Sequence, residues 1–359
     1  MKNLILYIII LLLILVIGCE KNATEPHFDK YIWKVSLPEL QGVDSRILKS
    51  AFTEADKTGF MDGLLVIRNG YIIAEGYYNG YDRLIPHNIK SVSKSFLSAL
   101  TGIAFSKGFL DSLDQKVLDY FPEYIHPGLD PRKYDITIRH LLTMRMGIER
   151  EEENLWDVVQ SANWIETIFE LPLLYDPGQR MRYNSCQTHL LSAILEKSSR
   201  MTTFEFAERY LANPMGITID QWVRDPQGYY FGGSEMYFTP REMATLGYVY
   251  LKKGWFNNWQ LVPKDWVEFT LTASTNNAPN EWGAWKNYNY AYLWWLGQFN
   301  NYAVFMAYGY GGQFVICFPD LNMVIVSTAE TEVDLDTSTI QEWAIFDIVS
   351  QYIVQAIIK

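Results

Sequence analysis

Short, continuous apolar runs of β-strand type occur near both ends of the chain. Two apolar runs, at 64–67 and 71–74, are separated by a segment that contains Asn69 and Gly70. Asn-Gly between two β-type runs is the strongest short-range signal for a hairpin. A second hairpin is predicted at 314–326, where two apolar runs surround a Pro-Asp-Leu-Asn turn. Each end of the chain therefore supplies a pair of antiparallel strands.

Helical periodicity dominates elsewhere. Asp44 is the expected N-cap of a helix and Gly59 its expected stop. The apolar face between them consists of Ile47, Leu48, Ala51, Phe52 and Ala55. A helix at the end of the chain is predicted from Ile340, Trp343, Ala344, Ile348, Tyr352 and Ile353. Residues from about 91 to 250 are mostly helical in pattern. Strands at both ends with helices between them predict an α+β fold, in which an antiparallel sheet flanked by helices carries an inserted all-helical part, with a cleft between the two.

The beginning of the chain differs from the rest in polarity. Residues 4–18 are apolar throughout, they follow the charged Lys2, and polarity returns abruptly at Cys19. This arrangement is typical of an export signal, and the run is shorter than the ~20 residues that a membrane-spanning helix needs. The sequence Val-Ile-Gly-Cys at 16–19 resembles the lipobox of bacterial lipoproteins, in which the cysteine is lipidated and becomes the first residue of the mature chain.

We therefore expect a lipoprotein signal peptide at 1–18, a lipid on Cys19, a tether at 19–42 and one folded domain at 43–359. The protein would be exported and anchored to a bacterial membrane through this lipid, on the periplasmic or cell-surface side. An uncleaved short anchor with an incidental cysteine is the alternative. Both interpretations place the folded part outside the cytoplasm.

Composition narrows the function classes. The chain has 359 residues and a formal net charge of -11, from 30 Lys and Arg against 41 Asp and Glu. A protein that binds the phosphates of nucleic acid needs the opposite balance, so nucleic acid is excluded as a partner. Beyond Cys19 only Cys186 and Cys317 remain, which permits one disulfide but no disulfide framework. The aromatic content is high, with 24 Tyr, 19 Phe and 12 Trp.

Ser91 and Lys94 form the first segment with candidate chemistry. The helical spacing of Val92, Phe96, Leu100 and Ile103 puts Ser91 in the first turn and Lys94 one turn later on the same face. A serine hydroxyl becomes a nucleophile when a neighbouring base takes its proton. A lysine can be that base when burial and the positive end of a helix dipole lower its pKa. A helix-capping serine beside a surface lysine is the alternative.

Tyr183 and Ser185 form the second segment, at a predicted junction between a loop and a helix. A tyrosine near Lys94 can move a proton to a leaving group. The alternative is a packed tyrosine whose hydroxyl is hydrogen-bonded, as is usual for the residue type.

The third segment leads directly into the strand predicted at 314–318 and consists of Tyr310, Gly311, Gly312 and Gln313. Glycines at a strand edge let a substrate approach the backbone closely. A strand N–H there, paired with the N–H of Ser91, would form an oxyanion hole. A tight turn without a chemical role is the alternative.

In this order, the three segments resemble the motifs of the serine β-lactamase and penicillin-binding-protein superfamily, in particular its class C-like branch of esterases, D-aminopeptidases and 6-aminohexanoate-oligomer hydrolases. Ser91 to Lys94 is similar to the Ser-x-x-Lys motif, Tyr183 to Ser185 to the class C Tyr-x-Asn motif, and Tyr310 to Gly312 to the Lys-Thr-Gly motif. The resemblance extends over about 45–357 and includes stretches without chemistry at 63–76, 136–144, 176–178 and 239–244. It implies the β-lactamase/DD-peptidase fold.

The resemblance also implies roles. Ser91 would be the acylated nucleophile, Lys94 its activating partner and Tyr183 the general base and acid. The substrate and oxyanion side would be formed by Ser185, Tyr310, Gly311, Gly312 and Gln313, with Ser185 holding either the Lys94 network or the substrate. The implied reaction is a two-step acyl transfer from a small-molecule or peptide-like substrate to water, without a metal or an organic cofactor.

Two departures bear on the substrate. Ser185 stands where the Tyr-x-Asn motif has Asn, and Tyr310 stands where penicillin-recognising members have Lys. A charged contact to a substrate carboxylate contributes roughly 1.5–3 kcal/mol, so its loss favours an ester or amide with a neutral acyl side. The alternative is a penicillin-binding or D-alanyl carboxypeptidase-like protein that acts on cell-wall peptide or β-lactam, or binds it without turnover.

Other features were assigned from the pattern alone. The acidic run at 151–153 is interpreted as a solvated loop. Several of the five aromatic residues upstream of the third segment are expected to line the substrate cleft: Trp282, Trp285, Tyr292, Trp294 and Trp295. Neither a His-Glu-x-x-His zinc site nor a Gly-x-Ser-x-Gly elbow occurs in the sequence.

Overall fold

The computed structural model describes residues 31–272 and 280–358. The predicted signal peptide at 1–18 and the proposed lipidation site Cys19 lie outside these residues. Both therefore stay predictions.

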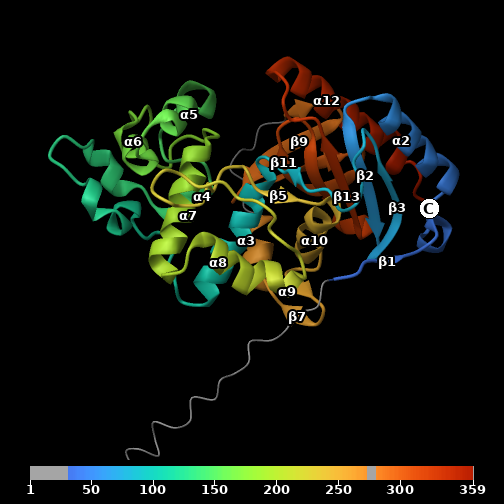
Figure 1. The fold of residues 1–359 in the computed structure, drawn as a ribbon, viewed down its shortest axis with the longest axis horizontal. Helices are drawn as coiled ribbons and strands as arrows, with labels where there is room; N and C mark the ends of the chain where they lie inside the picture. The colour runs from blue at the N-terminus through green and yellow to red at the C-terminus, as the bar shows by residue number, and fades with distance from the viewer. Residues whose placement is uncertain (1–30, 273–279, 359) are drawn as a thin grey trace, which may run out of the picture.

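A nine-stranded sheet forms one half of the molecule (Figure 1). Its spatial order is β1-β3-β2-β13-β12-β11-β10-β9-β8, and all neighbours are antiparallel except β1 and β3. The strands are β1 (Lys34–Val35), β2 (Met61–Arg68), β3 (Tyr71–Tyr77), β8 (Glu281–Trp282), β9 (Trp285–Ala291), β10 (Trp294–Phe299), β11 (Tyr302–Gly309), β12 (Gln313–Phe318) and β13 (Met323–Ala329).

Both predicted hairpins are present. The turn between β2 and β3 places Asn69 at φ 54° and Gly70 at φ 84°, which is the left-handed conformation that this hairpin turn requires. The second hairpin joins β12 to β13. Because β13 also pairs with β2, the two hairpins lie side by side at the centre of the sheet although they come from opposite ends of the chain.

Helices cover both faces of the sheet, so its central strands are apolar on both sides. Each face of the sheet has its own hydrophobic core. Along β2, Leu64 and Val66 belong to the core shared with α2 (Ser45–Lys57) and α12 (Leu335–Ile348), whereas Leu65 and Ile67 belong to the core on the other face. That core contains α3 (Val92–Ser106) and α10 (Pro240–Leu251). Two-sided burial explains why these strands have continuous apolar runs instead of alternation.

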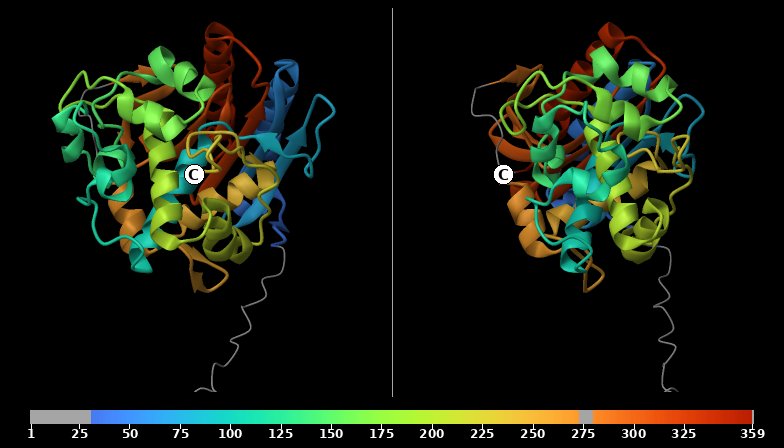
Figure 2. Two further views of the ribbon diagram at one scale, coloured as in Figure 1. Left: turned by 60° about the vertical axis from the view of Figure 1, so that its left-hand side comes forward. Right: turned by 90° about the vertical axis from the view of Figure 1, so that its left-hand side faces the viewer.

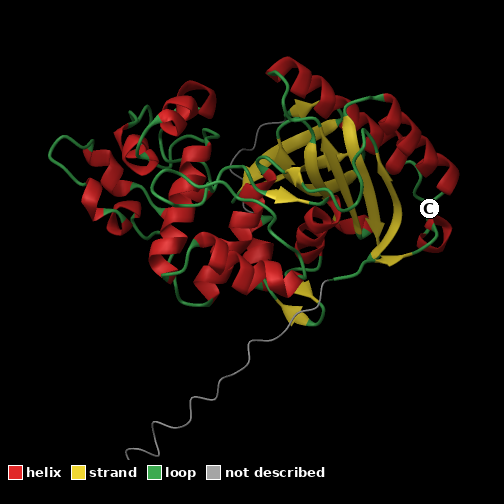
Figure 3. Ribbon diagram, in the orientation of Figure 1, coloured by secondary structure: helices red, strands yellow, loops and turns green. Residues whose placement is uncertain are grey.

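The helical half lies beside the sheet (Figures 1 and 3). It consists of α4 (Ile138–Leu142), α5 (Glu151–Gln160), α6 (Trp164–Glu170), α7 (Ser185–Ser199), α8 (Thr203–Ala207) and α9 (Asn213–Met215). At its centre is α7, which contacts α3, α4, α5, α6 and α8 and is buried along most of its length. These findings confirm the α+β architecture. The first and last helices of the predicted insertion, α3 and α10, pack against the sheet itself.

Part of the stretch predicted as a tether belongs to the fold. Trp33 is buried, with its indole nitrogen 3.3 Å from the carbonyl oxygen of Arg241, and β1 pairs with β3. The folded part therefore begins before residue 43.

The final helix is present, but its inward face differs from the predicted one. Ile340 and Trp343 are 63% and 44% exposed, whereas Gln341 and Glu342 are buried. Glu342 accepts hydrogen bonds from Tyr308 of β11 and from Ser338, and Gln341 donates to the carbonyl of Glu330. Such pairing makes their burial tolerable. Within the two described stretches, no helix is long and apolar enough to cross a membrane.

Gly247 sets the distance between α10 and the sheet. A Cβ at this position would lie 2.5 Å from Cγ1 of Val315 and 3.0 Å from Sγ of Cys317. We expect Gly247→Ala to lower the free energy of unfolding by about 1–3 kcal/mol because it overpacks this interface. Urea denaturation measures the effect, and the double variant with Val315→Ala should recover part of the loss. A stabilised Gly247→Ala protein would show that helix propensity outweighs packing here.

Candidate active site

Ser91 stands at the N-cap of α3, at the end of a short, tightly held connection. Ile89 donates its N–H to the carbonyl of Met236 at 2.9 Å, and Lys90 donates its N–H to the side chain of Asn88 at 3.0 Å. Lys90 has a φ of 47°, which is uncommon for a residue with a side chain. The hydroxyl of Ser91 does not cap the helix. It therefore stays available to other partners at the positive end of the helix dipole.

Lys94 lies one turn further along α3 and is 1% exposed. Its Nζ donates to Oγ of Ser91 at 2.7 Å, to Oγ of Ser185 at 2.9 Å and to the carbonyl oxygen of Gly233 at 2.7 Å. Burial lowers the pKa of Lys94 to about 8, although the nearby carboxylate of Glu151 opposes this effect. The amine thus has three acceptors from three different parts of the chain.

Ser185 begins α7 and is linked to Glu151, the first residue of α5. One carboxylate oxygen of Glu151 accepts the backbone N–H of Ser185 at 3.0 Å and its hydroxyl at 2.6 Å. The hydroxyl of Ser185 therefore donates to Glu151 while it accepts from Lys94. Of the two roles expected for Ser185, this geometry matches the one in the Lys94 network.

The segment that contains Gly233 packs directly against α7. A Cβ on Gly232 would lie 2.1 Å from the carbonyl oxygen of Thr188, and a Cβ on Gly233 would lie 2.5 Å from Cβ of Ser185. Only two adjacent glycines permit this approach. The approach brings the carbonyl of Gly233 to the lysine.

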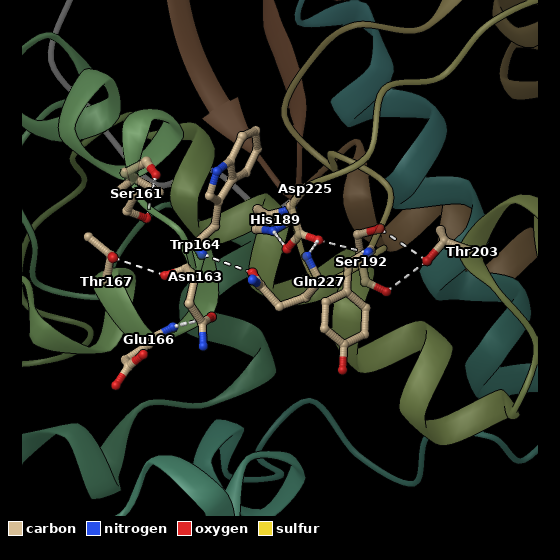
Figure 4. Close-up of polar contacts among 12 residues, drawn as sticks. Ser161, Asn163, Trp164, Glu166, Thr167, His189, Ser192, Thr203, Asp225 and Gln227 are labelled. Carbon is tan, nitrogen blue, oxygen red and sulfur yellow. Dashed lines mark hydrogen bonds and ion pairs between the residues drawn. The ribbon is translucent and has the colours of Figure 1, made fainter.

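A buried hydrogen bond between His189 and Asp225 holds the start of the same segment (Figure 4). Nε2 of His189 on α7 lies 2.9 Å from Oδ2 of Asp225, and both side chains are at most 1% exposed. The other carboxylate oxygen of Asp225 accepts the N–H groups of Gln227 and Tyr229. Phe231 then packs edge-on against His189, with 5.7 Å between ring centroids. These contacts attach the chain on both sides of Tyr230 to α7.

Tyr183 precedes the N-cap residue of α7 and faces the lysine. Nζ of Lys94 lies 4.8 Å from the centroid of its half-buried ring, which also contacts Tyr290 and Trp295. Burial and the carboxylate of Glu151 raise the pKa of Tyr183 well above its usual 10, against a hydrogen bond with Ser91 that lowers it. The phenol is thus held in its neutral form.

The third segment forms the loop between β11 and β12. Gly311 and Gly312 have φ values of 78° and 101°, which explains why glycine occupies both positions. The N–H of Gly311 donates to Ser338, whose hydroxyl donates to Glu342, so the buried polar residues of α12 support this loop. Gln313 is also buried, and its side chain bonds to the backbone of Ala329.

Gly309, the last residue of β11, determines how closely the sheet approaches the serine. A Cβ on Gly309 would lie 2.5 Å from the carbonyl oxygen of Ile89, two residues before Ser91. The C-terminal end of β11, a strand inside the sheet, and the turn that carries Ser91 are therefore in backbone contact.

A cavity of about 430 Å³ opens at Ser91. It brings together Ser91 and Ser185 with Tyr310, whose ring lies at the wall while its hydroxyl donates to the carbonyl of Val333 at 2.7 Å. Among the described residues that line it, the charged ones are Lys90, Glu151, Glu235 and Glu332. Lys90 lies 3.7 Å from Glu235 and 3.5 Å from Glu332, so the cavity is acidic on balance.

The prediction that several of the five upstream aromatic residues line the cleft is wrong for the cavity at Ser91. Trp285, Tyr292 and Trp294 are buried, and none of the five is among the described residues that line this cavity. Trp294 packs against Tyr250 and Phe305, far into the core. Of these five aromatic residues, Trp295 is the one whose ring contacts Tyr183. Most of the aromatic surplus therefore serves packing.

Two site groups were missed from the sequence. The run at 151–153 is the first turn of α5 and not a solvated loop, and Glu151 reaches the site. The position of these acidic residues could have indicated the start of a helix, because carboxylates are favoured in the first turn of a helix. Gly233 contributes a carbonyl, which no side-chain motif could reveal. Cys186 and Cys317 are both buried and free.

The chain is similar to several known proteins. A 6-aminohexanoate-dimer hydrolase of Paenarthrobacter ureafaciens is 25% identical over 254 residues, which cover 65% of this chain and 64% of that protein, just under two thirds of its length. A solved structure from Bacillus anthracis, provisionally named a 6-aminohexanoate-dimer hydrolase, has a TM-score of 0.73 and 20% identity, over 92% of this chain and 89% of that one. EstCE1, described as a hydrolase with promiscuous acyltransferase activity, has a TM-score of 0.67 and 17% identity, over 85% and 98%.

The sequence profile of the family named Beta-lactamase matches residues 58–349, which include all three predicted segments and most of the folded chain. The chain belongs to the beta-lactamase family.

Proposed function

We propose that this protein is a serine hydrolase that cleaves an ester or amide bond through an acyl-enzyme on Ser91. The observation that carries the proposal is the 2.7 Å contact between Nζ of Lys94 and Oγ of Ser91, at a buried amine whose pKa is lowered to about 8. The relative and the solved structure that are named as hydrolases support the same class of reaction.

Lys94 is the proposed base. With a pKa of about 8, roughly a tenth of the amines are neutral at pH 7, compared with fewer than one in a thousand at the usual value. A neutral Lys94 takes the proton of Ser91 as Oγ attacks the carbonyl carbon of the substrate. The backbone N–H groups of Ser91 and Gln313 are the proposed donors to the resulting oxyanion.

Tyr183 is the proposed proton donor to the leaving group. Its raised pKa keeps the phenol protonated at neutral pH, so it can donate as the C–O or C–N bond breaks. The proton that Lys94 received then returns to Tyr183. In the second half of the reaction water attacks the acyl carbon, the same groups accept and return its proton, and Ser91 leaves as a hydroxyl.

The cavity favours a substrate without a carboxylate near the scissile bond. Tyr310 supplies no charge, and the hydroxyl of Tyr310 is already bonded to Val333. The single lining cation among the described residues, Lys90, lies within reach of two carboxylates. A penicillin carboxylate would thus face net negative charge. These contacts support esters and amides with a neutral or cationic acyl part over β-lactams.

The location of the enzyme is a second proposal. We propose that Cys19 carries a lipid and that the domain works outside the cytoplasm, tethered to a bacterial membrane. The sequence at 16–19 and the apolar run before it support this placement.

A fluorophosphonate probe tests the nucleophile. We expect it to label the wild-type protein on Ser91, and we expect Ser91→Ala and Lys94→Ala to lose labelling and turnover of p-nitrophenyl esters while they keep the wild-type circular dichroism. The same proteins are then offered D-aminoacyl amides and nitrocefin. Unchanged ester turnover in Ser91→Ala would refute the proposal, and stable acylation by a labelled penicillin without ester turnover would support a penicillin-binding role instead.

Glu151 makes the base assignment testable through pH. Its carboxylate raises the pKa of Lys94, so Glu151→Gln should lower that pKa and move the rising limb of kcat/KM from about pH 8 to a lower pH. The glutamine can still accept a hydrogen bond from Ser185. Glu153→Gln, an exposed residue of the same turn, is the matched control and should leave the limb in place. A limb that does not move in Glu151→Gln would exclude Lys94 as the titrating base.

Gly309 tests whether catalysis depends on the approach of the sheet to Ser91. Gly309→Ala places a methyl group against the carbonyl of Ile89, so we expect kcat to fall by about tenfold or more as the two elements separate. Gly247→Ala also overpacks the sheet but lies away from Ser91, and we expect it to lower stability with little change in kcat. Equal effects of both variants on kcat would mean that the loss reflects general destabilisation.

A further inference from the structure

A short hairpin with two exposed tryptophans projects from the end of the molecule opposite α5 (Figures 1 and 2). It consists of β6 (Trp255–Phe256) and β7 (Trp259–Gln260). Trp255 and Trp259 are 48% and 58% exposed, whereas Phe256 between them is 3% exposed. Asn257 and Asn258, both at positive φ, form its turn. The hairpin is thus anchored by one aromatic side chain and presents two others to the surroundings.

A cavity of about 610 Å³ adjoins this hairpin. It lies between β7, the C-terminal end of α3 and the segment before α9, and its wall includes Ile103, Lys107, Arg209, Tyr210, Pro214 and Trp259. The cations Lys107 and Arg209 lie 5.4 and 5.6 Å from the ring centroid of Tyr210. No carboxylate is among the described residues that line it, in a protein whose net charge is -11. The cavity is therefore apolar and basic.

The chain enters the fold at this hairpin. Tyr31, the first described residue, packs edge-on against Phe256 with 4.6 Å between ring centroids. Ile32, the next residue, is 82% exposed. Tyr31 is the twelfth residue after Cys19, so the two are at most about 43 Å apart even in a fully extended chain. A lipid on Cys19 would hold this end of the molecule close to the bilayer.

We propose that Trp255, Trp259 and the adjoining basic cavity, together called the tryptophan face, rest in the headgroup region of the membrane to which the chain is tethered. Tryptophan prefers that region because its ring is apolar and its N–H is polar. Lys107 attracts anionic phosphate headgroups, and the apolar wall of the cavity accepts the start of an acyl chain. This inference rests on the proposed lipid at Cys19 and does not depend on the hydrolase reaction.

The contact would fix the orientation of the enzyme. Ser91 stands at the N-terminal end of α3 and Lys107 at its C-terminal end. The 15 residues of α3 span about 22 Å at 1.5 Å per residue. The tryptophan face on the membrane therefore holds the cavity at Ser91 away from the lipid, where it takes substrate from the aqueous side.

Quenching of tryptophan fluorescence by brominated lipid tests the orientation. The full chain is produced in a bacterium with its lipid, which mass spectrometry verifies on Cys19, and is reconstituted into phosphatidylcholine vesicles that contain brominated phosphatidylglycerol. We expect quenching of the wild-type emission and a smaller quenched fraction in the Trp255→Ser/Trp259→Ser protein. Trp156→Ser is the matched control: Trp156 on α5 is 72% exposed but lies at the opposite end of the molecule, so its removal should not reduce quenching.

The basic side of the cavity is tested with Lys107→Gln, for which we expect weaker quenching that depends less on salt. Thermal unfolding and ester turnover in solution should match the wild type in all these variants. Equal quenched fractions in the wild type and the Trp255→Ser/Trp259→Ser protein would overturn the inference. So would crosslinking of two copies through the hairpin, which would make the tryptophan face a dimer contact. A mature chain without a lipid refutes the tether, whereas loss of labelling at Ser91 bears only on the hydrolase proposal.

Discussion

The buried amine of Lys94 imposes the constraint on which the rest of the site depends. Its pKa falls from 10.5 to about 8, which corresponds to about 3 kcal/mol of unfavourable interaction with the charged form. Below pH 8 the fold bears this cost fully, and the cost declines as the pH rises toward the pKa of the unfolded chain. An amine in that position needs acceptors for its protons. Three parts of the chain supply them.

Those acceptors explain several features that otherwise look unrelated. The helical half must bring α7 against α3, because α7 begins with Ser185. Gly232 and Gly233 must lack side chains, because the carbonyl of Gly233 has to reach the lysine. The buried pair of His189 and Asp225 then fixes the segment that carries this carbonyl to the same helix. Packing in the helical half is therefore arranged around one amine at its border with the sheet.

Much of the fold could be predicted from the sequence, because the period of apolar residues reports local structure. Both hairpins and the helix capped by Asp44 follow from turn residues and caps that act over a few positions. The inward face of α12 could not be found this way. Its buried Glu342 accepts hydrogen bonds from Tyr308 of β11 and Trp282 of β8, and its buried Gln341 donates to the carbonyl of Glu330 just after β13. Apolar periodicity carries no information about these partners.

In the candidate site, too, the residues that belong to local sequence motifs could be predicted, and those that join through tertiary contacts could not. Ser91, Lys94, Tyr183 and Ser185 were found because their side chains and spacing form motifs, and the structure brings them together. Glu151 and Gly233 could not be found in this way. Glu151 joins the site through tertiary packing, and Gly233 contributes only its backbone carbonyl. The aromatic residues failed for a related reason: adjacency in sequence along β9 and β10 places alternate side chains on opposite faces of the sheet.

The direction of α3 connects the reaction to the proposed orientation. A helix carries partial positive charge at its N-terminus and partial negative charge at its C-terminus. At the first end this charge favours an oxyanion at Ser91 and disfavours the protonated form of Lys94. At the second end it favours cations, and Lys107 is the C-cap residue there, on the wall of the basic cavity. One helix would thus serve the proposed acyl-transfer site at one end and the proposed contact with anionic lipid at the other, and reversing its direction would disfavour both.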